Sequence, residues 1–276
     1  MFEHACNLMG PDGELFGIVG VAGGNGPATL VLGDEEPFEP FTALLSPGEP
    51  AERTGDALDV GRRLRLELAD AQLWTPEPIV RVLPAQEVQR RLKLAAQTGA
   101  TNAPAGGLAP LLPEALSIAE GSADLVTAAP HDLVVQRTRQ LLRDLAGAIR
   151  ERRWSGAHAP ARALSGLGPG LTPAGDDLLA GLALGLRAAL GTLPPEVQTA
   201  LTEAVLGRTT DLAAARVRHA AAGYPDERVH QLLTVLVMAP SSDDLPAAVR
   251  SLLEYGHSSG ADTLVGLIAG VGLGLA

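Results

Sequence analysis

A pattern that occurs twice, far apart in the chain, is the strongest constraint on how this sequence folds. Its first copy spans residues 168–182 and its second copy spans residues 256–267. In both, a glycine stands two residues before a hydroxyl side chain, and the motif Gly-x-Asp-x-Leu-x-Gly-Leu follows. Glycines have no Cβ, so repeated glycines on two helices let their backbones approach closely. We therefore predict two neighbouring helices, related by a local twofold axis, whose N-termini face one pocket.

The first copy has the residue types of an anion-binding helix start. Thr172 is expected to cap free backbone N–H groups, and Pro173 suits the first helical position. Gly168, Gly170 and Gly175 allow positive φ angles and a close approach of the backbone to a ligand. Because the positive end of the helix dipole lies there, a phosphate or a carboxylate would be stabilised.

Two carboxylates, Asp176 and Asp177, follow in the first turn of the same expected helix. They have two interpretations, and the sequence leaves both open. Acidic residues in a first turn compensate the helix dipole and contribute about 0.3–1 kcal/mol each. Alternatively, the pair orients a substrate amide or holds Mg²⁺.

The second copy offers the same chemistry at Ser258, Ser259 and Gly260, with Asp262 as its carboxylate. It adds His257, which stands between a glycine and two serines. A histidine at a helix start is commonly a hydrogen-bonded structural residue, but an accessible neutral imidazole can also carry protons. The candidate catalytic residues are the aspartates and the histidine of the two copies: Asp176, Asp177, His257 and Asp262.

A third helix start, at Arg208, Thr209 and Thr210, is a further candidate for contact with the ligand. The guanidinium of Arg208 offers a planar fork for an anion, and Thr209 or Thr210 can cap the helix. The alternative is a plain helix cap with an exposed arginine. The candidate substrate-binding residues come from all three helix starts: Gly168, Gly170, Thr172, Gly175, Arg208, Thr209, Ser258, Ser259 and Gly260.

The charge balance and the cysteine count exclude several classes of protein. The formal net charge is −11 and basic residues form no run longer than a doublet, so a nucleic-acid partner is not expected. The single cysteine, Cys6, excludes an internal disulfide and fits a reducing compartment. The N-terminus lacks the apolar stretch of a signal peptide. The apolar run 263–276 is shorter than the ~20 residues of a membrane span, so we expect a buried helix in a cytoplasmic protein.

The chain predicts an α+β protein, with a β-rich N-terminal part over residues 1–84 and a mainly helical part over residues 85–276. Short apolar runs at 16–21 and 28–32 are bounded by glycine-rich turns, and leucines alternate with charged residues over 63–68. Short strands of this kind suggest a small antiparallel sheet or barrel.

The second part shows helical spacing from residue 85 onwards. Residues 99–113 are rich in Gly, Pro, Ala and Asn, which indicates a linker or a long loop. A long amphipathic helix is expected over residues 131–153, and prolines are expected to break the chain over residues 160–173. Further helices, separated by Pro or Gly, are expected at 176–190, 195–206, 209–222, 226–238, 245–254 and 262–275.

Two of these segments resemble the signatures of a known family. Residues 166–177, Gly-Leu-Gly-Pro-Gly-Leu-Thr-Pro-Ala-Gly-Asp-Asp, are very similar to its main signature, and residues 256–262 resemble its C-terminal signature. The family includes the AllH-type subunit of oxamate carbamoyltransferase, and the resemblance spans most of the chain. The chain departs from the family pattern at Ala174 and Ala213, where serine is common, which removes two hydroxyls that could contact a ligand.

The resemblance implies a role in carbamoyl transfer during allantoin and purine catabolism, where carbamoyl phosphate and oxamate interconvert with oxalurate and phosphate. It also implies a hetero-oligomer, because AllH-type chains act with an FdrA-type and an AllG-type subunit. The Ser-Thr-Arg-Thr-Arg signature of ordinary carbamoyltransferases is missing, so their fold and mechanism are not carried over. At the motif-matched positions, the helix starts would hold a small anion such as carbamoyl phosphate. Asp176 or Asp177 would orient the attacking amine, and His257 would relay its proton.

Two other functions remain open on the sequence alone. The chain could be a non-catalytic scaffold subunit whose glycine-rich loops serve to pack against its partners. It could also be a metal-dependent hydrolase built on the candidate catalytic residues, although no tight metal-ligand spacing is present. No cofactor is expected, and Mg²⁺ on the aspartate pair is the one metal considered.

Overall fold

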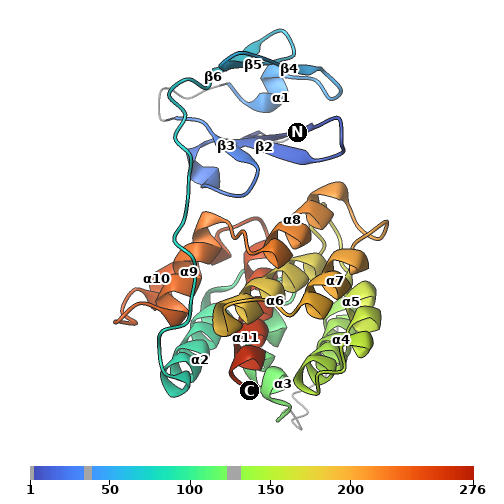
Figure 1. Cartoon of the computed structure of the whole chain (residues 1–276), viewed down its shortest axis with the longest axis vertical. Helices are drawn as coiled ribbons and strands as arrows, with labels where there is room; N and C mark the ends of the chain where they lie inside the picture. The colour runs from blue at the N-terminus through green and yellow to red at the C-terminus, as the bar shows by residue number, and fades with distance from the viewer. Residues whose placement is uncertain (1–2, 34–38, 123–131) are drawn as a thin grey trace. The chain divides into compact units, whose positions relative to one another are not determined.

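The computed structural model describes residues 3–33, 39–122 and 132–276 (Figure 1). It divides into two compact units, Met1–Glu77 and Pro78–Ala276. In the described part of the chain, every strand lies in the first unit, whereas the second unit is built from helices. The predicted α+β class, with a β-rich start and a helical end, is therefore confirmed.

The first unit contains two three-stranded sheets. The first sheet consists of β1 (Ala5–Met9), β2 (Leu15–Val19) and β3 (Thr29–Val31), and the second of β4 (Ala51–Thr54), β5 (Ala57–Val60) and β6 (Leu64–Glu67). A short 3-10 helix η1 (Val21–Gly23) and the short helix α1 (Phe41–Leu44) complete the unit. Its small core consists of Cys6, Ile18, Phe41, Leu45 and Val60.

The sequence predicted a small antiparallel sheet or barrel, and the first sheet is mixed. β1 and β2 pair antiparallel, but β2 and β3 pair parallel, because the connection through η1 leads the chain back to the start of β2. The second sheet is antiparallel throughout. The alternating segment does form a strand: in β6, Leu64 and Leu66 are half-buried, whereas Arg65 and Glu67 are exposed.

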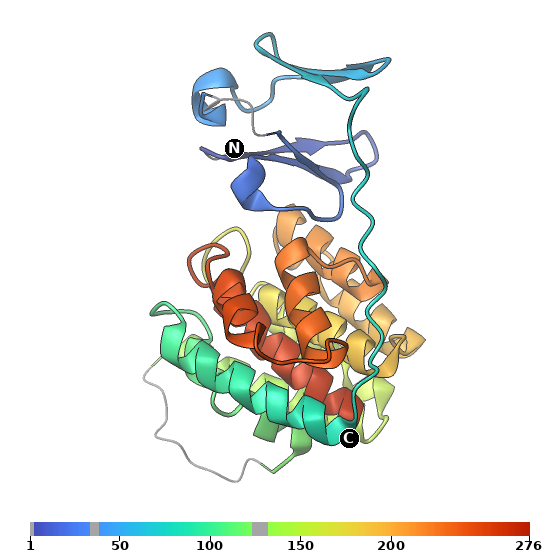
Figure 2. The same ribbon diagram turned by 90° about the vertical axis from the view of Figure 1, so that its left-hand side faces the viewer.

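The second unit is a bundle of α-helices (Figure 2). Its helices are α2 (Ala85–Asn102), α3 (Ala115–Glu120), α4 (Leu133–Arg150), α5 (His158–Leu164), α6 (Ala174–Leu190), α7 (Pro195–Ala204), α8 (Asp211–Ala222), α9 (Glu227–Val237), α10 (Leu245–Leu253) and α11 (Ser259–Leu275), with 3-10 turns η2 (Ala109–Leu111) and η3 (Trp154–Gly156). All the helices expected from the sequence are present, with ends that differ by a few residues. His131, the expected first residue of α4, lies outside the described residues.

Three features of the second unit differ from the expectation. α3 and α5 were not expected, and α5 contains Pro160, which stands in the first turn of the helix where no N–H donor is needed. α2 continues through Gly99 instead of giving way to a linker. A Cβ on Gly99 would lie 2.7 Å from the Leu264 side chain, so this glycine allows α2 to pack closely against α11. The expected linker or long loop is therefore shorter than predicted: α2 takes residues 99–102, and residues 103–108 form a loop before η2.

Helices α6 and α11 lie side by side in the middle of this unit and run parallel (Figures 1 and 2). A Cβ on Gly181 would lie 2.2 Å from the carbonyl oxygen of Thr263, and a Cβ on Gly266 would lie 2.1 Å from that of Leu178. The contact is reciprocal, so the predicted pair of neighbouring helices is confirmed. The glycines that face the opposite backbone are Gly181, Gly185, Gly266 and Gly270.

The apolar C-terminal run forms the buried helix that was expected. Residues 259–273 of α11 are all buried. In the described part of the chain, no helix combines the length and the apolar character that crossing a membrane requires.

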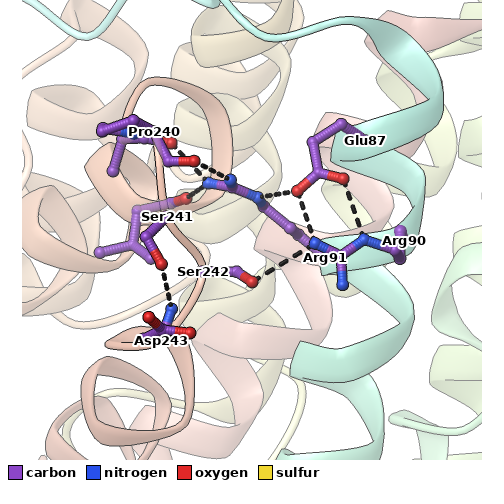
Figure 3. A network of polar contacts seen from close by, with 9 residues as sticks. Glu87, Arg90, Arg91, Pro240, Ser241, Ser242 and Asp243 are labelled. Atoms are coloured by element: carbon purple, nitrogen blue, oxygen red, sulfur yellow. Dashed lines mark hydrogen bonds and ion pairs between the residues drawn. The ribbon is translucent and has the colours of Figure 1, made fainter.

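A buried arginine completes the C-terminal end of α9 (Figure 3). Arg91 of α2 is 2% exposed and donates hydrogen bonds to three carbonyl oxygens, one in the last turn of α9 and two in the segment that follows it. They belong to Val235, Ala239 and Pro240, at 2.6, 2.8 and 3.3 Å. Glu87 accepts from the Nε of Arg91 at 2.6 Å. Hydrogen bonds from Arg90 and Arg91 lower the pKa of Glu87 to about 2, so the network stays charged at neutral pH.

Candidate functional site

The two copies of the motif meet at one end of the α6–α11 pair. The helices run parallel, so their N-termini lie at the same end. The hydroxyl of Thr172, in the loop before α6, and the hydroxyl of Ser259, the first residue of α11, form a hydrogen bond of 3.0 Å. This contact confirms that segments far apart in the sequence lie together, as the motif predicts.

The loop before α6 differs from the expected capping arrangement. Pro173 occupies the N-cap position, and no side chain there accepts a hydrogen bond from the first turn, so Thr172 is not the cap. Gly168 and Gly170 have φ angles of +116° and +96°, as predicted for a loop that needs glycine. Within the described residues, no hydrogen bond uses the backbone N–H groups of residues 168 and 170–172. These donors remain for a ligand or for water.

Gly175 and Gly260 occupy equivalent places in the two copies and have a packing role. A Cβ on Gly175 would lie 2.0 Å from the carbonyl oxygen of Leu164, at the end of α5. A Cβ on Gly260 would lie 2.0 Å from that of Leu252, near the end of α10. Each glycine thus allows its helix to start directly against the end of an earlier helix, and the local twofold extends to these contacts.

Asp176 connects the loop before α6 to the loop before α8. Its side chain is 1% exposed and accepts hydrogen bonds from the N–H of Gly166 at 3.0 Å and from the hydroxyl of Thr209 at 2.6 Å. Burial raises the pKa of Asp176, and these two hydrogen bonds oppose the rise. Both donors come from the protein itself and bond to Oδ2, which gives Asp176 and Thr209 a structural role; the buried Oδ1 atom of Asp176 has no partner among the described residues.

The start of α8 is capped by Thr210. Its hydroxyl accepts a hydrogen bond from the N–H of Ala213 at 3.1 Å and donates one to the carbonyl oxygen of Leu171 at 2.5 Å. The prediction that Thr209 or Thr210 caps this helix is confirmed. Arg208 is exposed and precedes the cap. A different arginine of this region reaches the carboxylates.

Asp177 is the least satisfied group of the site. Its side chain has no exposed surface, and neither carboxylate oxygen forms a hydrogen bond in the described part of the chain. Nε of Arg216, on α8, lies 3.4 Å from its Oδ1 atom. Burial raises the pKa of Asp177 from 3.8 to about 6, although the charge of Arg216 opposes the rise. The nearby hydroxyls of Ser259 and Thr172 also lower this pKa, and the hydrogen bond between them uses only one of their two protons.

Arg216 is a site residue that the sequence analysis missed. Its Nη2 atom lies 3.6 Å from Oδ2 of Asp226 and donates to the hydroxyl of Thr263 at 3.2 Å. The guanidinium also stacks 4.5 Å from the centre of the Tyr255 ring. Burial disfavours its charge, but Tyr255, Asp177 and Asp226 together raise the pKa of Arg216, so it remains a cation. The sequence holds one signal for Arg216, its position within an alanine-rich helix. Arg218 has the same surroundings, so that signal does not distinguish the two arginines.

Asp262 occupies the position in α11 that Asp177 occupies in α6. It is 1% exposed and accepts hydrogen bonds from the N–H of Leu108 at 2.5 Å and from the hydroxyl of Ser258 at 3.0 Å. Burial raises the pKa of Asp262 to about 6; the two hydrogen bonds oppose the rise, and the charge of Asp177 adds to it. The loop that holds Leu108 belongs to the expected linker, so this segment forms part of the site.

His257 is exposed at the start of α11, as the neighbouring glycine and serines indicated. Its Nε2 atom lies 3.9 Å from the position of a Cβ on Gly106. Within the described residues, His257 forms no hydrogen bond or ion pair. The histidine therefore lies at the rim of the cluster that the aspartates form.

Over residues 3–33, 39–122 and 132–276, no group of three His, Cys, Asp or Glu side chains is arranged to hold a metal ion. The geometry thus gives no support to Mg²⁺ on the aspartate pair or to a hydrolase built on it. What the fold does bring together is Thr172, Asp177, Ser258, Ser259, Asp262 and the cation Arg216.

Comparison with known protein families gives two matches. Residues 1–73 match the AllH family N-terminal domain, and residues 164–271 match the oxamate carbamoyltransferase subunit AllH. The second match contains both copies of the motif and Arg216. No solved structure matches the chain. Since the two matches together cover more than half of the sequence and come from one family, this chain belongs to the AllH family.

Proposed function

We propose that this chain is a subunit of an oxamate carbamoyltransferase-like complex and binds a small anion, such as carbamoyl phosphate, at the joined starts of α6 and α11. The observation that carries this proposal is the hydrogen bond between Thr172 and Ser259. It holds the two glycine-rich helix starts of the AllH-matched segment together.

Positive charge and free donors at this place support an anion site. Each helix N-terminus carries roughly half a positive charge, and two of them converge here. The backbone N–H groups of residues 168 and 170–172 have no partner among the described residues. Arg216 supplies a full positive charge beside Asp177, in the first turn of α6. Asp177 and Asp262 would repel an anion when both are ionised, and their pKa values of about 6 reduce that repulsion.

The same arrangement suits carbamoyl transfer. The reaction needs a site for the phosphate, donors for the carbonyl oxygen as charge develops on it, and a means to orient the attacking amine. The helix starts would provide the first two. Asp177 would orient the amine, and His257 at the rim would relay its proton. FdrA-type and AllG-type chains are the proposed partners, and a cytoplasmic role in purine catabolism is the proposed setting.

The test is oxamate-dependent release of phosphate from carbamoyl phosphate by the chain assembled with its partner subunits. His257→Ala is expected to lower the rate by about 10²-fold or more, the usual contribution of a positioned proton carrier. Asp177→Asn is expected to lower it by about 10²-fold, because the attacking amine loses its orienting carboxylate. His158→Ala is the matched control, because His158 is an exposed histidine on α5, outside the site. Unchanged rates in both site variants would remove these residues from the mechanism.

A scaffold subunit is the second candidate, because Gly175 and Gly260 serve helix packing. It predicts that Thr172→Ala alters assembly with the partner subunits and leaves the turnover of the assembled complex unchanged. Size-exclusion chromatography of the complex, run beside the phosphate assay, separates the two functions.

A further inference from the structure

Asp177 offers a hydrogen-bond acceptor, and Arg216 offers a donor beside it. The two side chains do not form a hydrogen bond with each other. Their closest atoms, Oδ1 and Nε, lie 3.4 Å apart, whereas a charge-assisted hydrogen bond between such groups measures about 2.7–2.9 Å. Asp177 has no exposed surface and accepts no hydrogen bond from any described residue. Buried carboxylates nearly always have donors, so the two oxygens of Asp177 have room for a further donor, which a ligand can supply.

Arg216 is held in place by groups other than Asp177. Thr263 and Asp226 contact its Nη2 atom, and the Tyr255 ring stacks against the guanidinium. The guanidinium therefore keeps its position when Asp177 binds another group. Acceptor and donor then stand next to each other at fixed places.

We propose that Asp177 and Arg216 together recognise a primary carboxamide group, H₂N–C=O, with Asp177 accepting the amide N–H and Arg216 donating to the amide oxygen. This inference rests on the proposed function. It adds which end of the substrate contacts α6. The group is common to carbamoyl phosphate and oxamate. The anionic end of either molecule would then lie against the free N–H groups of residues 168 and 170–172, which precede the same helix.

The proposed pair also discriminates against close analogues. A carboxylate in place of the carboxamide would bring a second negative charge to Asp177. A methyl group in place of the amine would leave the buried carboxylate without a donor, and sites built around such a donor reject analogues that lack it.

Access to Asp177 requires the loop over residues 168–172 to move. The loop is held by the hydrogen bond from Thr172 to Ser259 and by that from Thr210 to the carbonyl of Leu171. Leu171 at its tip is 53% exposed, and the Arg216 side chain is 17% exposed. Opening the loop breaks these two side-chain hydrogen bonds.

Isothermal titration of the full-length chain with oxamate and with pyruvate tests the proposal. Pyruvate keeps the carbonyl and carboxylate of oxamate but has a methyl group in place of the amine. We expect oxamate to bind at least tenfold more tightly than pyruvate. Asp177→Asn should reduce that ratio to about threefold or less, because the amide N–H loses its charged acceptor. Arg216→Lys should weaken both ligands, because lysine lacks the planar fork.

Asp176→Asn is the matched control, because this buried carboxylate of the same turn is held through its Oδ2 atom by Gly166 and Thr209 and forms no ion pair with Arg216 among the described residues. It should keep the wild-type ratio of oxamate to pyruvate affinity. Titrations with inorganic phosphate and carbamoyl phosphate separate the two proposals. If phosphate binds but oxamate and pyruvate bind with equal affinity, the proposed carboxamide site is wrong and the proposed anion site is still supported. A wild-type ratio in Asp177→Asn would also overturn the carboxamide site, and failure of phosphate, carbamoyl phosphate and oxamate all to bind would overturn both.

Discussion

The reciprocal glycine contact between α6 and α11 predicts that a single methyl group will force the two helices apart. In Gly266→Ala, the new Cβ would lie 2.1 Å from the carbonyl oxygen of Leu178 and 2.8 Å from the amide nitrogen of Leu182. Ordinary van der Waals contact begins at 3.4 Å, so the closest contact is too short by more than an ångström. Both neighbours are backbone atoms of a buried helix, and no side-chain rotation can relieve the clash.

The magnitude follows from two opposing terms. Alanine is a better helix former than glycine by about 1 kcal/mol. Inserting a methyl group into a packed interface costs about 1–3 kcal/mol, occasionally more, and a backbone clash belongs at the upper end. We therefore expect a net loss of roughly 2 kcal/mol in the free energy of unfolding. For a unit of about 200 residues, this lowers the Tm by about 4–8 °C.

Thermal unfolding followed by the circular dichroism of the helices measures the effect. Gly147→Ala on α4 is the matched control, because a Cβ on that glycine would meet nothing within 4 Å. The control should show only the helix-propensity gain and raise the Tm by a few degrees. A Gly266→Ala protein with an unchanged or higher Tm would refute the reasoning, because it would show that α6 and α11 are not in backbone contact.

Three further perturbations have expected outcomes. The folded pKa of Asp177, about 6, lies above its ordinary value of 3.8, so the folded chain holds more protons between these pH values and stability falls as pH rises through that window. Asp177→Asn should therefore match the wild type near pH 3.8 and exceed its stability by on the order of 1–3 kcal/mol above pH 6, as thermal unfolding across pH would show. Arg91→Met should lose about 3 kcal/mol or more in urea unfolding, because it leaves buried carbonyl oxygens without their charged donor. Glu87 keeps its hydrogen bonds from Arg90 in that variant, and Arg90→Ala, whose side chain is 61% exposed, should leave the urea midpoint nearly unchanged. Thr210→Ala removes the α8 cap and should lower the free energy of unfolding by about 1 kcal/mol, and an unchanged urea midpoint would show that this cap contributes nothing.

The sequence allowed the helical part and the pairing of the two motifs to be predicted because both depend on local signals. Proline and glycine mark the ends of the helices. Glycines spaced along one face of a helix indicate that another element packs closely against that face, but they do not identify that element. The proximity of Thr172 and Ser259 followed from the second copy of the pattern.

The details of the site depend on tertiary packing, and local signals did not reveal them. Gly99 suggested a break in the chain, because its close contact with Leu264 of α11 is invisible in a window of neighbouring residues. Arg208 was the natural choice for a cation, but it precedes the cap of α8 and is exposed. Arg216, two turns further along, reaches Asp177 because of the way α8 docks on α6. Leu108 contributes a donor to Asp262 from a segment whose composition indicated a linker.

The three buried aspartates of the site differ in a way that the local symmetry does not explain. Asp176 receives two hydrogen bonds from Gly166 and Thr209, and Asp262 receives two from Leu108 and Ser258. Asp177 is related to Asp262 by the motif, is as deeply buried, and receives none. Burial of an unsatisfied carboxylate opposes folding, so packing alone would favour a neutral residue there. A group that weakens the empty fold and lies beside a cation and two free helix starts is best explained by the ligand that would satisfy it.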